Sequence, residues 1–513
     1  MASSNFILAT RLLLLLYLSG VLWLVIRGAR KVKSMSDYAV GSVQFSPMAV
    51  GLSLAASITS AATFIINPGF VALYGLSAVL AMGVILPIFA LISLYILTKG
   101  FRNHGAALKA LTMAQWIGKR YDSPLYALFF AFLSLLLLTF IVLICVGLTS
   151  ILAQSLNAEP LYVLIGIVVF VFGYMMFGGA NSMVYTNLIQ ALLMLVVACV
   201  LLSSGYKHFS EGVSAFLDKL HSIDPALVAA TNPESFLFRD FFEVILCNAV
   251  VGVAILCQPH IITKSLMLKS DRDVNVYLRT GILAEILFFM VILVGLYARL
   301  EFPNLEADGQ ALKMDSIVSA YVVRVFPVGL GLVVVLGLIS AGLSTLEGLI
   351  QSLSTTITSD ILKSFLGERF FENERRAIWL NRLVIVVLAV LAIFLSYEQI
   401  QSPNLSVGIF AQNGVYAYFS AAFVPVLFGT FLRDTPLIAP VAATITAVVV
   451  HFGVYYGELT WYMQSSVKNP AVAATFAILS SLLVGGICYL IFRNKNKGML
   501  SADGTAASNL ASS

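Results

Sequence analysis

The stretch "GLISAGLSTLEGLIQSLSTTITSDI", residues 337–361, is apolar enough to cross a membrane, yet it carries polar side chains at its centre. Two hydroxyls stand side by side at Ser344 and Thr345, and a glutamate follows at Glu347. A charge at the middle of a bilayer costs roughly 2.5–3.5 kcal/mol on insertion scales, so such a side chain has to face protein or water. The stretch therefore predicts a buried helix that lines a functional site.

The composition of the whole chain indicates a membrane protein. Hydrophobic residues make up 60% of the 513 residues and charged residues 11%, with a mean hydropathy of +0.96, whereas soluble domains carry about 25% charge. A spanning helix needs roughly 20 mostly apolar residues. Thirteen such runs follow one another along the chain: 6–26, 46–74, 76–98, 124–153, 160–178, 184–204, 240–259, 277–298, 328–359, 376–396, 405–430, 435–456 and 470–492.

The distribution of basic residues predicts the orientation. Of the 30 Lys and Arg, 22 fall in loops on one side of the thirteen runs and seven on the other. Because basic loops stay in the cytoplasm, we expect a multi-pass protein of the plasma (inner) membrane with its N-terminus outside and its C-terminus inside. In the longest outer loop, "KHFSEGVSAFLDKLHSIDPALV" (207–228) has the spacing of a short interfacial helix.

The chain is expected to form one membrane domain, 1–513. All five cysteines lie inside apolar runs, which predicts neither a disulfide framework nor a metal site. Its parts are an extra N-terminal helix with a cytoplasmic linker (1–45), a ten-helix core (46–430), two additional helices (431–495) and a disordered tail (496–513).

Two of the runs are predicted to contain broken helices. The run 46–74, helix 1 of the core, has Pro68 and Gly69 deep within it, and the run 240–259, helix 6, has Gly252 and Pro259. These helices are five apart, which is the spacing of corresponding members in a five-helix inverted repeat. The alternative is an ordinary proline or glycine kink in each.

Polar side chains share one face on each of two helices, because the steps between them follow the helical repeat. They are Ser340, Ser344, Glu347 and Gln351 in the opening stretch, and Ser53, Ser57, Ser60 and Asn67 in helix 1. If the two faces meet, they form an oxygen-lined pocket that suits a monovalent cation, and sodium fits best. The alternative is that each hydroxyl bonds to its own helix or joins neighbouring helices.

Four segments together resemble the sodium/solute symporter family, which includes sodium/proline, sodium/pantothenate and sodium/glucose transporters. They are "SDYAVGS" (36–42), "ASITSAATFIINPGF" (56–70), "QPHIITKSLMLKS" (258–270) and "SAGLSTLEGLIQSLSTTITSDIL" (340–362); "FGGANSMVYTNLIQALLM" (177–194) is similar to the junction of the family's helices 4 and 5. The resemblance implies an all-α LeuT-type fold with a 5+5 inverted repeat and about 13 transmembrane helices. It also implies sodium-coupled symport by alternating access, with no cofactor beyond Na⁺ as coupling ion.

The resemblance also implies a set of sodium ligands. These are the backbone carbonyls of Ala56, Thr59 and Ala341 and the hydroxyls of Ser344 and Thr345. Two positions depart from the family pattern. Asn187 stands where many members have an aspartate that serves a second sodium in some relatives, and Ile58 stands where proline transporters have an acidic residue.

The substrate region implied by the resemblance lacks the aromatic residues of proline transporters on helices 1 and 6. The matching positions are Ala62, Val251 and Ile255. Polar groups expected near the pocket are Asn67, Gln258, Gln412, Asn413 and Tyr416. We expect a small amino acid such as proline, or a small carboxylate such as pantothenate or a monocarboxylate.

Glu347 is open to two interpretations: it takes a proton or helps ion release toward the cytoplasm, or it is a carboxyl group bonded to a neighbouring helix. For Glu285 in helix 7, the second interpretation is favoured. The first makes a proton-coupled carrier an alternative to sodium symport, and a transporter-like sensor acting through a separate partner is another. An enzyme is not expected, since the five histidines (His104, His208, His221, His260, His451) are scattered. The expected partners are a small solute, Na⁺ and lipid but no nucleic acid, with the protein a monomer or weak oligomer.

Overall fold

The structure of the protein is a computed structural model that describes residues 4–41, 45–268, 270–307, 309–401, 407–432 and 434–510. Side chains are described within these ranges except at 4–7, 103–108, 271 and 494–510. Parts of the sequence predictions therefore lie outside the described residues, namely Ser42 of the first family segment, the basic residues Lys269 and Arg433, the start of the run 405–430, and residues 511–513.

Helices form almost the whole of the described chain, with short 3₁₀- and π-helical segments (η) among the α-helices. The first half comprises α1 (Ser4–Ala29), α2 (Met35–Val40), α3 (Pro47–Ile58), η1 (Ala62–Ile66), α4 (Asn67–Tyr74), α5 (Leu76–Ala78), η2 (Val79–Ile85), α6 (Leu86–Leu108), α7 (Met113–Arg120), α8 (Pro124–Leu133), η3 (Ser134–Leu137), α9 (Leu138–Leu156), α10 (Pro160–Ser203), η4 (Tyr206–Phe209), α11 (Gly212–Ile223), η5 (Pro225–Val228), η6 (Phe242–Cys247), α12 (Asn248–Ala254) and η7 (Ile255–Cys257).

The second half begins at the second break described below. It comprises α13 (Pro259–Ile262), η8 (Thr263–Met267), α14 (Asp271–Met290), η9 (Val291–Leu293), α15 (Val294–Glu301), the paired strands β1 (Glu306–Ala307) and β2 (Gln310–Ala311), η10 (Met314–Ser316), α16 (Ile317–Val325), α17 (Val328–Thr356), η11 (Ile357–Leu362), α18 (Lys363–Leu366), α19 (Glu368–Phe371), α20 (Glu374–Gln401), α21 (Val407–Phe431), α22 (Ile438–Tyr456), η12 (Trp461–Met463) and α23 (Pro470–Leu510).

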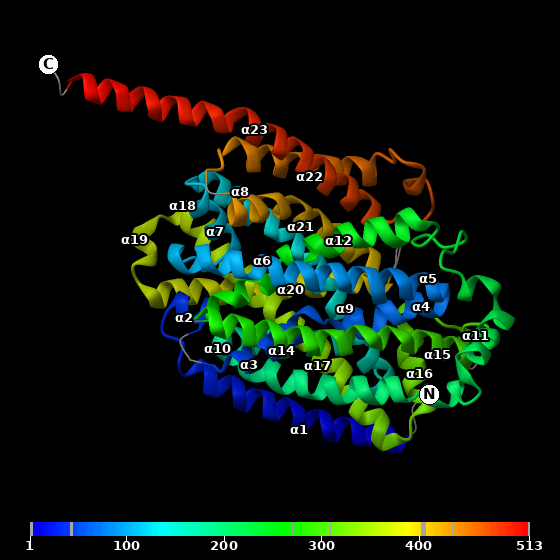
Figure 1. The fold of residues 1–513 in the computed structure, drawn as a ribbon. Coiled ribbons are helices and arrows are strands. Elements are labelled where there is room, and N and C mark those ends of the chain that lie inside the picture. The colour runs from blue at the N-terminus through cyan, green and yellow to red at the C-terminus, as the bar shows by residue number, and fades with distance from the viewer. Residues whose placement is uncertain are drawn as a thin grey trace.

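The long helices lie alongside one another, with α1 along one edge of the bundle and α22 and α23 along the opposite edge (Figure 1). α10 packs against α1, α3 and α17, and α21 packs against α9, α22 and α23. In the most apolar window of each span, 72% of the α17 residues and 89% of the α21 residues are buried, against 17% for α1 and 28% for α23. The opening stretch of the sequence therefore lies at the centre of the molecule, as predicted.

Each of the thirteen predicted runs falls on helix. Among the described residues, ten helices are long and apolar enough to span a membrane, or up to twelve if each of two bent pairs is one span. α10 counts once in these numbers and covers two predicted runs, because it consists of two helices that meet at Gly179. Gly179 has φ +62°, and a Cβ there would lie 2.7 Å from the Tyr38 ring. A span count of thirteen remains a prediction.

The first predicted break is real but lies elsewhere in the helix. α3 and the segment from Ala62 to Tyr74 meet at an angle of 56°, and Thr59 between them is extended (φ −81°, ψ 107°). The expected position, Pro68, lies instead in the first turn of α4. Proline is tolerated there because its missing N–H interrupts no interior hydrogen bond. The hydroxyl of Ser60 accepts a hydrogen bond from the Ala62 N–H and so covers the start of the second half.

The second predicted break is confirmed at one of its two positions. The segment Phe242–Cys257 bends by 61° into Pro259–Met267, and Gln258 between them is extended (φ −83°, ψ 134°). Pro259 begins the new helix, since its fixed φ suits a first position. Gly252, the other expected position, lies within α12.

Two peripheral segments test further predictions. The expected short helix in the loop 207–228 is present as α11, which buries Phe216 and Leu220. At the C-terminal end, α23 runs to Leu510, through the segment from 496 that the sequence predicts to be disordered.

Candidate functional site

The predicted sodium residues come together where α3 ends against the middle of α17. The Ser344 hydroxyl donates to the Ala56 carbonyl at 2.6 Å and faces the Ala341 carbonyl at 3.1 Å. The Thr345 hydroxyl lies 3.3 Å from the carbonyl oxygens of Thr59 and Ala341 and 3.5 Å from that of Ser57. We call these four carbonyls and two hydroxyls the oxygen cluster. All six residues are buried, and Ile58, which lies between Ser57 and Thr59, is half-buried.

The oxygen cluster has more acceptors than donors. Carbonyls at the C-terminal end of a helix have no partner within that helix, and α3 ends at Ile58. Three of the four carbonyls stand at the end of α3, and the fourth, that of Ala341, lies inside α17. They face two hydroxyl groups, each of which supplies a single proton. A hard cation would satisfy the remaining lone pairs, and uncharged oxygens would hold it weakly enough to release it.

The two polar faces predicted from the sequence do not meet as a whole. Only Ser344 of the α17 face reaches α3. Ser340 contacts the Tyr17 hydroxyl of α1 at 3.1 Å, and Gln351 donates to the Ala39 carbonyl of α2. The two faces meet only at Ser344, because α17 is surrounded by helices and its polar side chains contact several of them.

Glu347 points into α10 and away from the oxygen cluster. Its carboxylate accepts hydrogen bonds from the Tyr174 hydroxyl at 2.5 Å, the Thr186 hydroxyl at 2.5 Å and the Gln190 amide at 3.2 Å. Glu285 is similarly held, since the Thr59 hydroxyl lies 3.0 Å from both of its oxygens. Both buried carboxyl groups therefore have hydrogen-bond donors from neighbouring segments. This agrees with the second interpretation given above, a carboxyl group bonded to a neighbouring part of the fold.

Asn187 connects Glu347 to a buried lysine. With its amide nitrogen toward Glu347, it donates to a carboxylate oxygen at 3.2 Å, and its amide oxygen then accepts from the Lys264 ammonium at 3.1 Å. This orientation satisfies both ends of the amide, which is how such assignments are made. Lys264 is one of the basic residues that the sequence places in a cytoplasmic loop, and the structure instead buries it with 3% of its surface exposed.

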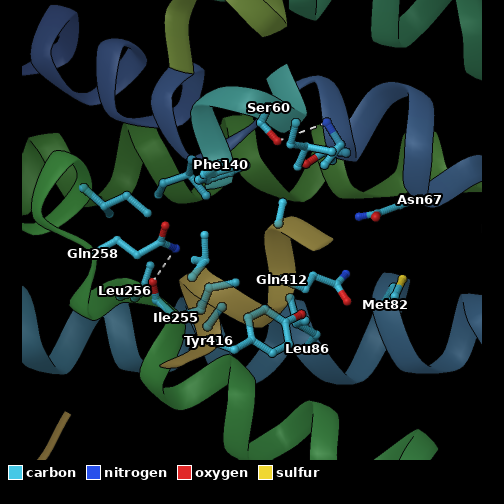
Figure 2. Close-up of a pocket in the computed structure, with 18 of the residues that line it drawn as sticks. Ser60, Asn67, Met82, Leu86, Phe140, Ile255, Leu256, Gln258, Gln412 and Tyr416 are labelled. Carbon is cyan, nitrogen blue, oxygen red and sulfur yellow. Dashed lines mark hydrogen bonds between the residues drawn. The ribbon is translucent and has the colours of Figure 1, made fainter. Parts of the chain in front are cut away.

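A cavity lies between the two helix breaks (Figure 2). Its empty volume, including the space at its opening, is about 1030 Å³. Six of the predicted substrate residues line it: Ala62, Asn67, Ile255, Gln258, Gln412 and Tyr416. Figure 2 shows Asn67, Gln258, Gln412 and Tyr416 around the same space. Among its described lining residues, none is Asp, Glu, Lys or Arg.

Two predicted substrate residues do not line the cavity. Val251 is fully buried in α12. Asn413 donates to the Tyr456 hydroxyl at 3.0 Å and lies 3.0 Å from His451 Nε2, so it joins α21 to α22. Neighbouring helix positions point in directions about 100° apart, which is why Gln412 faces the cavity and Asn413 faces the next helix.

His260 is a wall residue of the cavity that its sequence surroundings did not predict. Its side chain lines the cavity with 2% of its surface exposed, and its ring lies edge-on to Phe140, with centroids 6.0 Å apart. Neither ring nitrogen has a hydrogen-bond partner among the described residues, and the same holds for Gln258 Oε1. The sequence feature that could have identified His260 is its place directly after Pro259, where the second broken helix resumes.

Buried polar groups without partners are uncommon in proteins and call for an explanation, for example a bound water, ion or ligand. His260 and Gln258 lie on either side of Pro259, and both line the cavity. This end of the cavity therefore offers an acceptor from Gln258, and a donor and an acceptor from a neutral histidine.

A helical bundle with two broken spans, an oxygen cluster at one break and a cavity between both is the architecture of an ion-coupled secondary transporter. Residues 38–434 match the model of the sodium:solute symporter family. The chain belongs to this family and is a sodium-coupled secondary transporter rather than an enzyme.

Individual relatives agree with this assignment over nearly the whole chain. The sodium/pantothenate symporter of Escherichia coli is 28% identical over 88% of this chain and 90% of its own. The sodium/proline symporter of Salmonella typhimurium is 24% identical over 87% and 88%. A solved Na⁺-coupled sialic acid symporter in a substrate-bound outward-open state superposes with a TM-score of 0.77 at 18% identity, covering 94% of this chain and 97% of that one. The fold is therefore LeuT-like.

Proposed function

We propose that the protein imports a small organic solute together with sodium by alternating access, and that sodium binds in the oxygen cluster. The observation that carries the proposal is the surplus of acceptors there: four carbonyls face the hydroxyls of Ser344 and Thr345. An ion in this position would join α3 to α17. It would stabilise whichever conformation brings these helices together, because it binds that conformation better.

The direction of transport follows from the expected orientation in the plasma membrane, with the N-terminus outside. Each positive charge that moves inward gains about 2.3 kcal/mol per 100 mV of membrane potential. The sodium concentration gradient adds to this driving force.

For the solute, we propose a small carboxylate or amino acid that carries a hydrogen-bonding group besides its carboxylate. The cavity wall is mostly apolar, with unpaired polar atoms on Gln258 and His260. Relatives transport pantothenate and proline, and pantothenate combines an apolar body with hydroxyl, amide and carboxylate groups. The polar end of the cavity offers partners for such groups. We further propose that the protein acts as a monomer or weak oligomer.

The test is thermal stabilisation of the purified protein by sodium, with potassium as the comparison ion. Ser344→Ala/Thr345→Ala should lose the sodium shift. The matched control is Ser354→Ala/Thr355→Ala, a second Ser–Thr pair in α17 whose hydroxyls donate to the Gln351 carbonyl of their own helix. Loss of the shift in the control as well would contradict the assignment.

The same assay separates the alternatives. A shift with pH and none with sodium would favour a proton-coupled carrier that uses Glu347. In proteoliposomes with an inward sodium gradient, uptake of labelled pantothenate, proline or monocarboxylates would support transport. A solute that stabilises the protein but is never accumulated would favour a sensor.

A further inference from the structure

The ammonium of Lys264 occupies a small oxygen-lined site next to the oxygen cluster. It donates to the Ser53 carbonyl at 2.7 Å, to the Ser53 hydroxyl at 2.9 Å and to the Ser57 hydroxyl. The amide oxygen of Asn187 lies 3.1 Å away as a further acceptor. These oxygens come from α3 and α10, while the lysine reaches them from η8, directly after the second break.

Carbonyl, hydroxyl and amide oxygens are also the ligands that small hard cations use in proteins. A lysine ammonium is a compact point charge that such a group of oxygens can hold in the same way. The site around Lys264 therefore has the chemistry of a monovalent cation site whose cation is covalently attached to the chain.

A counter-charge for this cation lies on the other side of a single bridging residue, Asn187. Glu347 is fully buried, and the amide of Asn187 bridges it to Lys264, with its nitrogen 3.2 Å from the carboxylate. A buried carboxylate without a compensating positive charge is strongly unfavourable. The fixed ammonium thus supplies a charge that a bound ion would otherwise have to supply.

The lysine site and the oxygen cluster share Ser57. Its hydroxyl accepts from Lys264, and its carbonyl lies 3.5 Å from the Thr345 hydroxyl. The two positions are therefore adjacent along α3. Two cations at this spacing repel each other, and the carboxylate of Glu347 offsets that repulsion.

We propose that the Lys264 ammonium is a built-in cation that fills the position of a second coupling ion, so that the protein binds one sodium in each transport cycle. This inference rests on the proposed sodium symport. In this inference, Lys264 sets the number of sodium ions that bind, because its ammonium occupies the oxygens of Ser53, Ser57 and Asn187.

The experiment counts sodium bound to the purified protein, with ²²Na⁺ alone as the probe, and measures the Hill coefficient of the sodium-dependent thermal shift. The wild type should bind one sodium with a Hill coefficient near one. Lys264→Ala should bind two, because the vacated oxygens and Glu347 recruit a second ion. Lys264→Arg keeps the charge and should bind one, and Lys264→Ala/Glu347→Gln removes both charges and should return to one.

Two sodium ions in the wild type, or one in a folded Lys264→Ala, would overturn the inference. No sodium in the wild type would instead refute the proposed function. If Lys264→Ala does not fold, Asn187→Asp provides a second test, since it adds a carboxylate beside the lysine. The Asn187→Asp protein should still bind one sodium, and two would show that the lysine does not fill the position.

Discussion

The hydroxyl of Ser344 lies 2.6 Å from the carbonyl oxygen of Ala56, which is 288 residues earlier in the chain. This contact joins the middle of α17 to the last turn of α3, immediately before the first helix break. In the proposed function, a sodium ion would take the place of this hydroxyl proton between the two oxygens. Binding of the ion would then be coupled to the approach of α3 and α17 at this contact.

The Thr59 hydroxyl should contribute to stability without being needed for the ion. Thr59→Val keeps the carbonyl of the oxygen cluster but leaves Glu285 without its donor. We expect the free energy of unfolding to fall by about 1–3 kcal/mol while sodium affinity changes by less than tenfold. Thermal unfolding at several sodium concentrations measures both, and Thr59→Ser, which retains the hydroxyl, is the control. A large loss of sodium affinity with unchanged stability would contradict this division of roles.

The polar end of the cavity should determine solute affinity. His260→Phe and Gln258→Leu each remove a group that would bond the solute, and the loss of one such bond costs about 1–3 kcal/mol, or roughly 5–150-fold in affinity. Titration with the transported solute in the presence of sodium checks this. The sodium-dependent thermal shift should persist in both variants, and Phe140→Leu tests whether the effect of His260→Phe comes only from packing.

The kink in α10 should require a glycine. Gly179→Ala places a methyl group 2.7 Å from the Tyr38 ring and forces a positive φ on alanine, so we expect a loss of more than about 1 kcal/mol. Gly166→Ala, in the same helix, is the control, because a Cβ at Gly166 would meet nothing within 4 Å. That variant should be neutral or gain up to about 1 kcal/mol. Equal melting temperatures for the two variants would show that the kink carries no strain.

The loop that contains η4 and α11 should lose stability in acid. Burial and then the neighbouring Lys219 ammonium lower the pKa of His208 below its ordinary value of 6.5, and its ring stacks on Tyr297 at 6.1 Å. The unfolded chain then binds the proton more readily, so stability is complete above pH 6.5 and declines as the pH falls through the lowered pKa. His208→Phe should reduce the fall in melting temperature on acidification, whereas replacement of the exposed His221 by Gln should leave it unchanged.

Much of the fold followed from the demands of lipid on the sequence. Within the described residues, every run of about 20 apolar residues is mostly helix, because the bilayer leaves no other partner for the backbone. The position of Ser344 and Thr345 against polar groups of another helix was also predictable, since hydroxyls so deep in a span have to face protein or water. The position of the first break was not, because Pro68 fits the start of a helix as well as it interrupts one.

The side-chain partners of the site depend on contacts between distant segments, and sequence spacing does not encode them. Lys264 has the sequence surroundings of a loop residue, and only the bend at Gln258 turns it toward Ser53 and Ser57. His260 is one of five histidines in the sequence, and its lack of a hydrogen-bond partner became visible only with the cavity wall around it.

The oxygen cluster and the cavity are neighbours that share little. None of Ala56, Thr59, Ala341, Ser344 or Thr345 belongs to the described cavity wall. In the proposed function, solute preference can therefore change through wall residues such as Gln258 or Gln412 while the proposed sodium ligands stay unchanged. This separation makes the scaffold modular: a change of solute requires other cavity residues, and the proposed sodium ligands need not change with them.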